Sequence, residues 1–120
     1  MNIKALYPAL ITRNVDLAIE NMKKLGFEIV HSQRDIFSRG SIGYVMETKN
    51  GQRLDVVYTE MEEQDLHAIR VNVDDFEEAL PVFQTMGFEI FKGPKTNDAS
   101  KVVLLKSPDG LFVILMQHLK

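Results

Sequence analysis

The chain has 120 residues, of which 45% are hydrophobic and 26% are charged, and this composition fits one globular domain with its own core. It contains no cysteine, which excludes disulfides, thiolate metal ligands and cysteine nucleophiles, and we expect a cytoplasmic location. A net charge of −3 without a cluster of Lys and Arg argues against nucleic acid as a partner. The stretch before Pro8 is short and no segment is long and apolar enough to span a bilayer, so we expect neither a signal sequence nor a membrane partner.

The chain contains an internal repeat. Residues 14–29 (NVDLAIENMKKLGFEI) match residues 75–90 (DFEEALPVFQTMGFEI) at a constant offset of 61 positions. Each segment begins with a residue suited to capping a helix, Asn14 or Asp75, and continues with apolar residues on one helical stripe. Each ends at a glycine, Gly26 or Gly87, where a left-handed helix end needs no Cβ. The repeat therefore predicts two amphipathic helices.

Alternating apolar runs surround both helices and predict strands. We expect strands at 3–12, 27–33, 36–48 and 52–59 in the first half, and at 66–73, 88–93, 101–107 and 111–117 in the second. The order is β-α-β-β-β, twice. The sequence thus predicts an α+β fold with a single domain, 1–120, built of two βαβββ modules at about 1–60 and 65–120.

Glycine and proline mark the expected interruptions. Asn50-Gly51 and Pro108-Asp109-Gly110 predict tight turns. Pro81 lies inside the second helix, where it lacks an amide hydrogen, and predicts a kink or a shortened helix. Residues 93–100 (GPKTNDAS) have the composition of a loop.

Two βαβββ units, helices that end in LGFE or MGFE, and a PDG turn before the last strand together resemble the vicinal oxygen chelate superfamily. This superfamily includes glyoxalase I, extradiol dioxygenases and bleomycin-resistance proteins, and the resemblance covers essentially the whole chain. It implies that the modules form a curved mixed sheet around a central cavity, and that the protein is a homodimer. Because the scaffold hosts many activities, the resemblance fixes function less tightly than fold.

The resemblance also implies where metal ligands would lie. Carried onto this chain, the four ligand positions hold Tyr7, Asp55, Ala68 and Ile114, of which only Asp55 is a plausible ligand. His67 lies one residue from the expected place, so its side chain points to the opposite face unless a β-bulge turns it. We therefore expect no metal and no other cofactor.

If the strands alternate regularly, one face collects an apolar surface with a few polar groups, as small-molecule sites commonly do. The predicted ligand-binding residues are Tyr7, Asp55, Arg70, Asn72, Phe112, Ile114 and Met116. Asp55 and Arg70 either orient a ligand or form a salt bridge with each other, since each is costly to bury alone. Whether His118 reaches this face stays open, because it lies near the carboxyl end.

These observations favour a metal-free protein that binds a small molecule, closest to the bleomycin-resistance-type branch, and that sequesters a planar or cationic compound. One alternative is a metal-dependent lyase or dioxygenase of the same superfamily. Another is a non-catalytic regulatory or interaction domain whose cavity its own side chains fill. The replaced ligand positions favour binding over catalysis, and we assign no catalytic residue.

Overall fold

The computed structural model describes residues 1–36, 40–59 and 65–119. Its elements follow the predicted order, β-α-β-β-β twice. The first half contains β1 (Ile3–Thr12), α1 (Val15–Lys24), β2 (Glu28–Arg34), β3 (Ile42–Glu47) and β4 (Arg53–Tyr58). The second contains β5 (Leu66–Val73), α2 (Phe76–Thr85), β6 (Glu89–Thr96), β7 (Ser100–Lys106) and β8 (Phe112–His118).

The chain divides into two compact units, residues 7–67 and residues 1–6 with 68–120. In the first unit the strand order is β2-β3-β4-β1, with β1 parallel to β4 and the other pairs antiparallel. In the second unit the order is β5-β8-β7-β6, with β5 parallel to β8 and the other pairs antiparallel. The internal repeat of the sequence is therefore a repeat of strand pairing as well.

Both helices end in the same way. Gly26 and Gly87 have φ values of 101° and 91°, which a residue with a Cβ rarely adopts. The amide of Phe27 donates to the carbonyl of Met22 at 3.0 Å, and the amide of Phe88 donates to that of Phe83 at 3.2 Å. These bonds define Schellman ends, so the glycines act as predicted.

The two helices begin differently. Asp75 accepts a hydrogen bond from the amide of Glu78 at 3.1 Å, as a capping residue does. Asn14 makes no capping bond with its side chain, which corrects that expectation. Its own amide donates instead to Thr12 Oγ1 at 2.9 Å.

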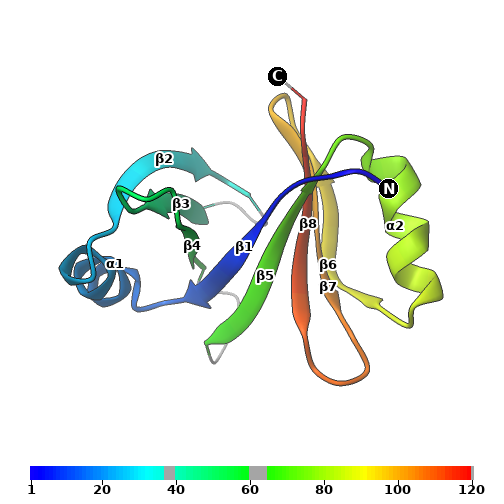
Figure 1. Cartoon of the computed structure of the whole chain (residues 1–120). Helices are drawn as coiled ribbons and strands as arrows, with labels where there is room; N and C mark the ends of the chain where they lie inside the picture. Colours follow the sequence, from blue (N-terminus) through cyan, green and yellow to red (C-terminus); the bar gives the residue numbers. More distant parts are fainter. Residues whose placement is uncertain (37–39, 60–64, 120) are drawn as a thin grey trace. The chain divides into compact units, whose positions relative to one another are not determined.

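α2 packs closely on its sheet and α1 does not. Phe76, Ala79 and Phe83 of α2 are buried in a core with Val71, Val73, Val103, Leu105, Val113 and Leu115. Figure 1 shows α2 beside β5, β8, β7 and β6. None of the residues Val15–Lys24, all of which the structure describes, is buried.

Three local predictions need correction. Pro81 does not shorten α2, which has ten residues, as α1 has. The expected loop at 93–100 is mostly strand, because β6 continues to Thr96 and β7 begins at Ser100. The strand expected at 36–48 begins only at Ile42, after Asp35 and Gly40 adopt positive φ, while residues 37–39 lie outside the described part.

Both predicted turns are confirmed. Gly51 has a φ of 84°, and the amide of Thr48 donates to the carbonyl of Gln52 at 3.0 Å across the β3–β4 hairpin. Gly110 has a φ of 91°, and the amide of Ser107 donates to the carbonyl of Leu111 at 2.8 Å. These turns set the register of the strands that carry the candidate site.

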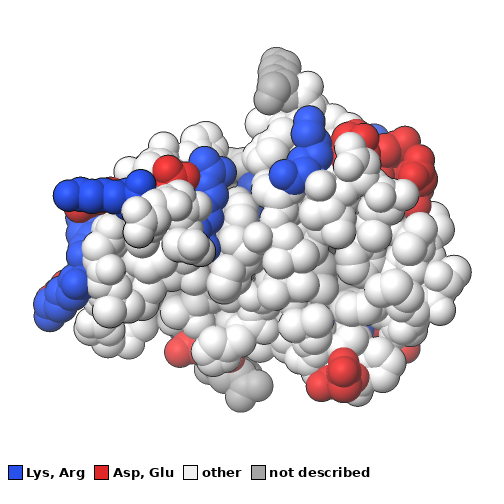
Figure 2. Space-filling view, in the orientation of Figure 1, with Lys and Arg blue, Asp and Glu red and all other residues white. Residues whose placement is uncertain are grey.

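Within the described part of the chain, no helix is long and apolar enough to cross a membrane. Figure 2 shows both Lys or Arg side chains and Asp or Glu side chains on the face of the molecule that it draws.

Candidate functional site

The pairing of β5 with β8 places most of the predicted site residues on one face of their unit. Ala68, Arg70 and Asn72 lie opposite Phe112, Ile114 and Met116. The alternate residues of both strands, including Val71 and Val113, pack toward α2. Because side chains alternate along a strand, the two sets point to opposite sides, as the sequence predicts.

Arg70 is the centre of a polar cluster on this face. Its side chain is buried, with 3% of its surface exposed. Nε donates to Asn72 Oδ1 at 3.0 Å, and Nη2 lies 2.8 Å from Met116 Sδ and 3.2 Å from His118 Nε2. A buried guanidinium needs acceptors of this kind, and we call Arg70, Asn72, Met116 and His118 the arginine cluster.

A hollow of about 210 Å³ opens beside the arginine cluster. Its lining residues are Lys4, Asn72, Val73, Asp74 and His118. Asn2 borders it at the amino end of β1, where Nδ2 donates to Asp74 Oδ2 at 3.0 Å. Two members of the arginine cluster therefore line a space that a small ligand could enter.

The remaining site residues of this unit are apolar and well covered. Ile114 and Met116 are almost fully buried, with 1% and 0% of their surface exposed. Phe112 contacts Phe91 edge to face, with ring centroids 5.1 Å apart, and Lys106 Nζ lies 5.5 Å from its centroid. These three side chains form the packed floor of the face, and Phe112 lies at the end away from His118.

Tyr7 and Asp55 belong to the other compact unit. Asp55 is 1% exposed and pairs with Ala9 on one side and Val45 on the other. Tyr7 precedes Ala9 by two residues on β1, so its side chain shares the face of Asp55. The ion pair between Asp55 and Arg70 stays a prediction.

Arg53 adds charge to the same face as Asp55. Its Nε donates to Glu47 Oε2 at 2.7 Å, and this hydrogen bond raises the pKa of the Arg53 guanidinium. The half-exposed pair is screened by water, so it adds little to stability.

The described residues do not fit a metal centre of the kind that the resemblance implies. Among them, no three His, Asp or Glu side chains are grouped so that they could hold an ion. β5 pairs with β8 without a register shift from Ala68 to Asn72, and His67, just before this stretch, is exposed. Ile114 and Ala68 offer no donor atom at their positions.

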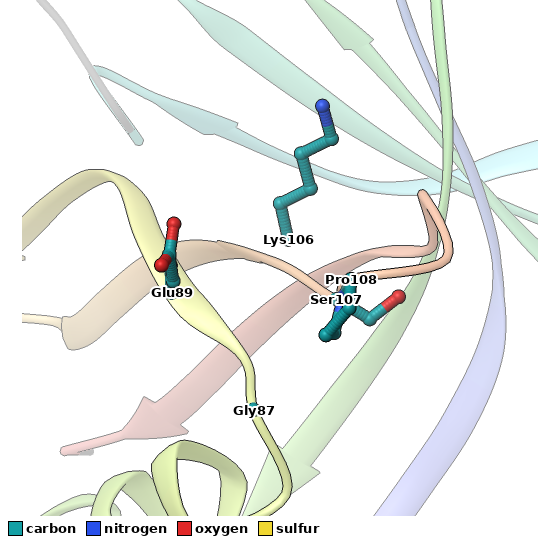
Figure 3. A pocket seen from close by; sticks show the side chains of 5 residues that line it. All are labelled: Gly87, Glu89, Lys106, Ser107 and Pro108. Carbon is teal, nitrogen blue, oxygen red and sulfur yellow. The ribbon is translucent and has the colours of Figure 1, made fainter.

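The described residues line two further hollows. The first, of about 260 Å³, is shown in Figure 3 with Gly87, Glu89, Lys106, Ser107 and Pro108 around it. Ser107 is occupied by its turn, since its hydroxyl donates to Asp109 and accepts from the amide of Leu111. The second, of about 390 Å³, lies at the start of α1 beside Tyr44 and Tyr58, where the lightly packed helix leaves space.

Sequence reasoning undervalued two residues of the site. His118 is the last residue of β8, and its pairing with Ser100 of β7 holds it in the sheet. Lys4 lies three residues before Tyr7 on β1. Strand alternation therefore places the two side chains on opposite faces and gave no reason to include Lys4. The signal for both is long-range pairing, which a local pattern does not contain.

The comparisons with known proteins agree on the fold. No protein-family model and no curated protein matches the sequence. A methylmalonyl-CoA epimerase from Streptomyces coelicolor superposes with a TM-score of 0.66 and 14% identity over 95% of this chain and 96% of its own. Glyoxalase I from Zea mays gives 0.66 and 14% over 94% of this chain and 42% of its own.

A glyoxalase/bleomycin resistance protein/dioxygenase superfamily member from Vibrio splendidus gives a TM-score of 0.58 and 17% identity over 97% of this chain and 99% of its own. This chain has the fold of the vicinal oxygen chelate superfamily. The α+β architecture of paired βαβββ modules is thereby confirmed. At these identities, the likeness to the solved structures concerns the fold alone.

Proposed function

We propose that this vicinal oxygen chelate protein binds a small organic molecule without a metal ion, in the manner of the bleomycin-resistance-type branch. The observation that carries the proposal is the arginine cluster beside its hollow. A buried arginine whose partners line an accessible space is a common way to orient a ligand.

The donor set supports binding rather than metal-assisted catalysis. A catalytic metal needs several nitrogen or oxygen ligands and an open coordination position. The neighbours of Asp55 on the adjacent strands, Ala9 and Val45, offer no ligand atom, and the nearby Glu47 carboxylate is paired with Arg53. We derive no reaction step through a metal.

The second candidate is a metal-dependent lyase, isomerase or dioxygenase. It is favoured by the presence of enzymes, an epimerase and glyoxalase I, among the proteins of similar fold. The third reading, a regulatory or interaction domain with a filled cavity, is favoured by the burial of Ile114 and Met116, whereas the hollow at Asn72 and His118 favours ligand binding. Homodimer formation and a cytoplasmic location stay predictions.

Metal analysis separates the first two candidates. The protein is purified without chelators and its content of Mn, Fe, Co, Ni and Zn is measured, with Asp55→Ala as the matched variant. We expect substoichiometric metal in both samples. One metal ion per chain that disappears in the variant would overturn metal-free binding in favour of the enzyme.

A further inference from the structure

The hydrogen bonds of Arg70 fix the orientation of the Asn72 amide. A guanidinium carries five N–H donors and no acceptor, so the atom of Asn72 that faces Arg70 Nε at 3.0 Å is its oxygen. The NH₂ group of Asn72 is therefore the end that points away from Arg70. At the hollow, Asn72 offers two donors.

The same argument fixes the tautomer of His118. Arg70 Nη2 lies 3.2 Å from His118 Nε2, and only a nitrogen with a lone pair can accept from it. With Nε2 as the acceptor, the ring hydrogen lies on Nδ1. His118, like Asn72, is turned into a donor by the arginine behind it.

Lys4 adds a third donor, and the first with a charge. It lines the hollow with Asn72 and His118, and an ammonium group only donates. Asp74 is the one carboxylate among the described lining residues, and its Oδ2 already accepts from Asn2 Nδ2. The wall thus combines three donor groups, one ammonium, one amide and one imidazole, with a single carboxylate, Asp74, which already accepts from Asn2.

We propose that the hollow beside the arginine cluster binds the carboxylate of a small planar acid, and that Arg70 selects this ligand indirectly by orienting Asn72 and His118. This proposal rests on the proposed function, of which it names the ligand class. It replaces the cationic ligand expected from the net charge, because local donors decide recognition where the net charge is only −3.

The test compares three planar probes of nearly the same shape: benzoate, benzamide and benzamidine. Each is titrated into the isotope-labelled protein while the amide signals of Asn72, Val73, Asp74 and His118 are followed by NMR. We expect benzoate to shift these signals at the lowest concentration and benzamidine at the highest. A preference for benzamidine would overturn the carboxylate proposal and leave small-molecule binding intact.

A substitution at Lys4, with a matched control, tests whether this lining residue contributes to the affinity for benzoate. Lys4→Met should weaken benzoate binding about ten- to a hundredfold, the range expected for one charge-assisted hydrogen bond. Lys101→Met is the matched control, because Lys101 pairs with Glu77 at 3.0 Å and does not line the hollow. Equal effects of the two variants would overturn the proposal.

Asn72→Asp exchanges the outward donors for a carboxylate while keeping an acceptor for Arg70 Nε. We expect this variant to lose affinity for benzoate and to gain affinity for benzamidine. If none of the three probes shifts the amides of the hollow in the unchanged protein, both the proposal and the proposed function fail at this site.

The tautomer of His118 can also be measured directly, without any variant. A long-range ¹H–¹⁵N spectrum of the unchanged protein reports which ring nitrogen of His118 carries hydrogen. We expect hydrogen on Nδ1 and a lone pair on Nε2. Hydrogen on Nε2 would show that Arg70 does not orient this ring.

Discussion

Gly43 on β3 shows how one missing Cβ shapes the region around Asp55. An added Cβ at this position would overlap the Cδ1 atom of Ile36, and would lie 3.9 Å from Asp55 Oδ1. Ile36 is 1% exposed, so it has little room to move aside. The glycine is therefore required by packing and not by an unusual backbone angle.

We expect Gly43→Ala to destabilise the protein by about 1–3 kcal/mol, the usual cost of overfilling a packed region. The free energy of unfolding is measured by urea titration. An unchanged or raised stability would contradict the packing that the structure shows.

The matched partner of this substitution is Ile36→Val, which removes the overlapping Cδ1 atom. Alone it should cost about 0.5–1.5 kcal/mol. Combined with Gly43→Ala, it should recover most of the stability that the alanine removes, since the new methyl occupies the vacated space. Additive losses in this double-mutant cycle would mean that the two positions do not compete for one space.

At the residue scale, strand alternation predicted which side chains share one face of the sheet, but not which residues line the hollow. Period-two alternation placed Arg70, Asn72 and Met116 together correctly, because it is a local property of strands. It did not include Lys4, which reaches the hollow through the arrangement of the amino end of β1 beside Asp74. Contacts of this kind join residues about seventy positions apart, and no local pattern encodes them.

At the scale of elements, the repeated helices have diverged in how tightly they pack. Phe83 of α2 is buried and contacts Phe88 edge to face, with ring centroids 5.3 Å apart. Its counterpart in α1 is Met22, which is only half-buried. Leu17 and Leu25, on and just after α1, are 50% and 69% exposed. The helix whose apolar stripe carries two phenylalanines, Phe76 and Phe83, is the better packed one.

We expect Phe83→Ala to cost about 3–5 kcal/mol, as buried Phe to Ala changes do. Met22→Ala, at the equivalent position, should cost about 1 kcal/mol, because a half-buried side chain loses less contact. Urea titration of both variants measures the difference. Hydrogen exchange should also show faster exchange in α1 than in α2.

Equal costs for the two substitutions would show that α1 is packed as tightly as α2. Such a result would also mean that light packing of α1 does not account for the hollow beside Tyr44 and Tyr58.

At residues 93–100, composition predicted a loop, whereas β6 continues to Thr96. Gly93 and Pro94 favoured a loop, yet both lie within β6. β6 is at the end of the described strand order, so the missing amide of Pro94 removes no bond to a further described strand. The pairing of β6 with β7 shifts register between Ile90 and Lys95, the stretch that contains Gly93 and Pro94. Position in the sheet, which the sequence does not reveal, decides whether proline is tolerated.

At the scale of the whole molecule, the repeat leaves apolar residues exposed at equivalent places. Ile29 on β2 is 39% exposed and Ile90 on β6 is 43% exposed, and the two are related by the repeat. Each belongs to a strand at the end of the described order. Exposed apolar edges favour association, because their backbone and side chains can pair with another chain.

We propose, in keeping with the resemblance, that the protein is a homodimer. Light scattering during gel filtration should then give twice the 13.7 kDa mass of one chain. Ile29→Lys or Ile90→Lys should shift the mass toward one chain, while Val82→Lys on α2 serves as a control for adding a lysine elsewhere. A single-chain mass at every concentration would contradict the dimer.

The arginine cluster has a consequence for how such a site can change its preference during evolution. Arginine keeps its proton at every pH at which proteins fold, so the framework behind the ligand is constant. If the hollow binds a ligand as proposed, an exchange at Asn72, in front of Arg70, would reverse the polarity that the ligand meets, while the buried cation and the strands around it stay in place. A single substitution would then carry the site from one class of ligand to the opposite class.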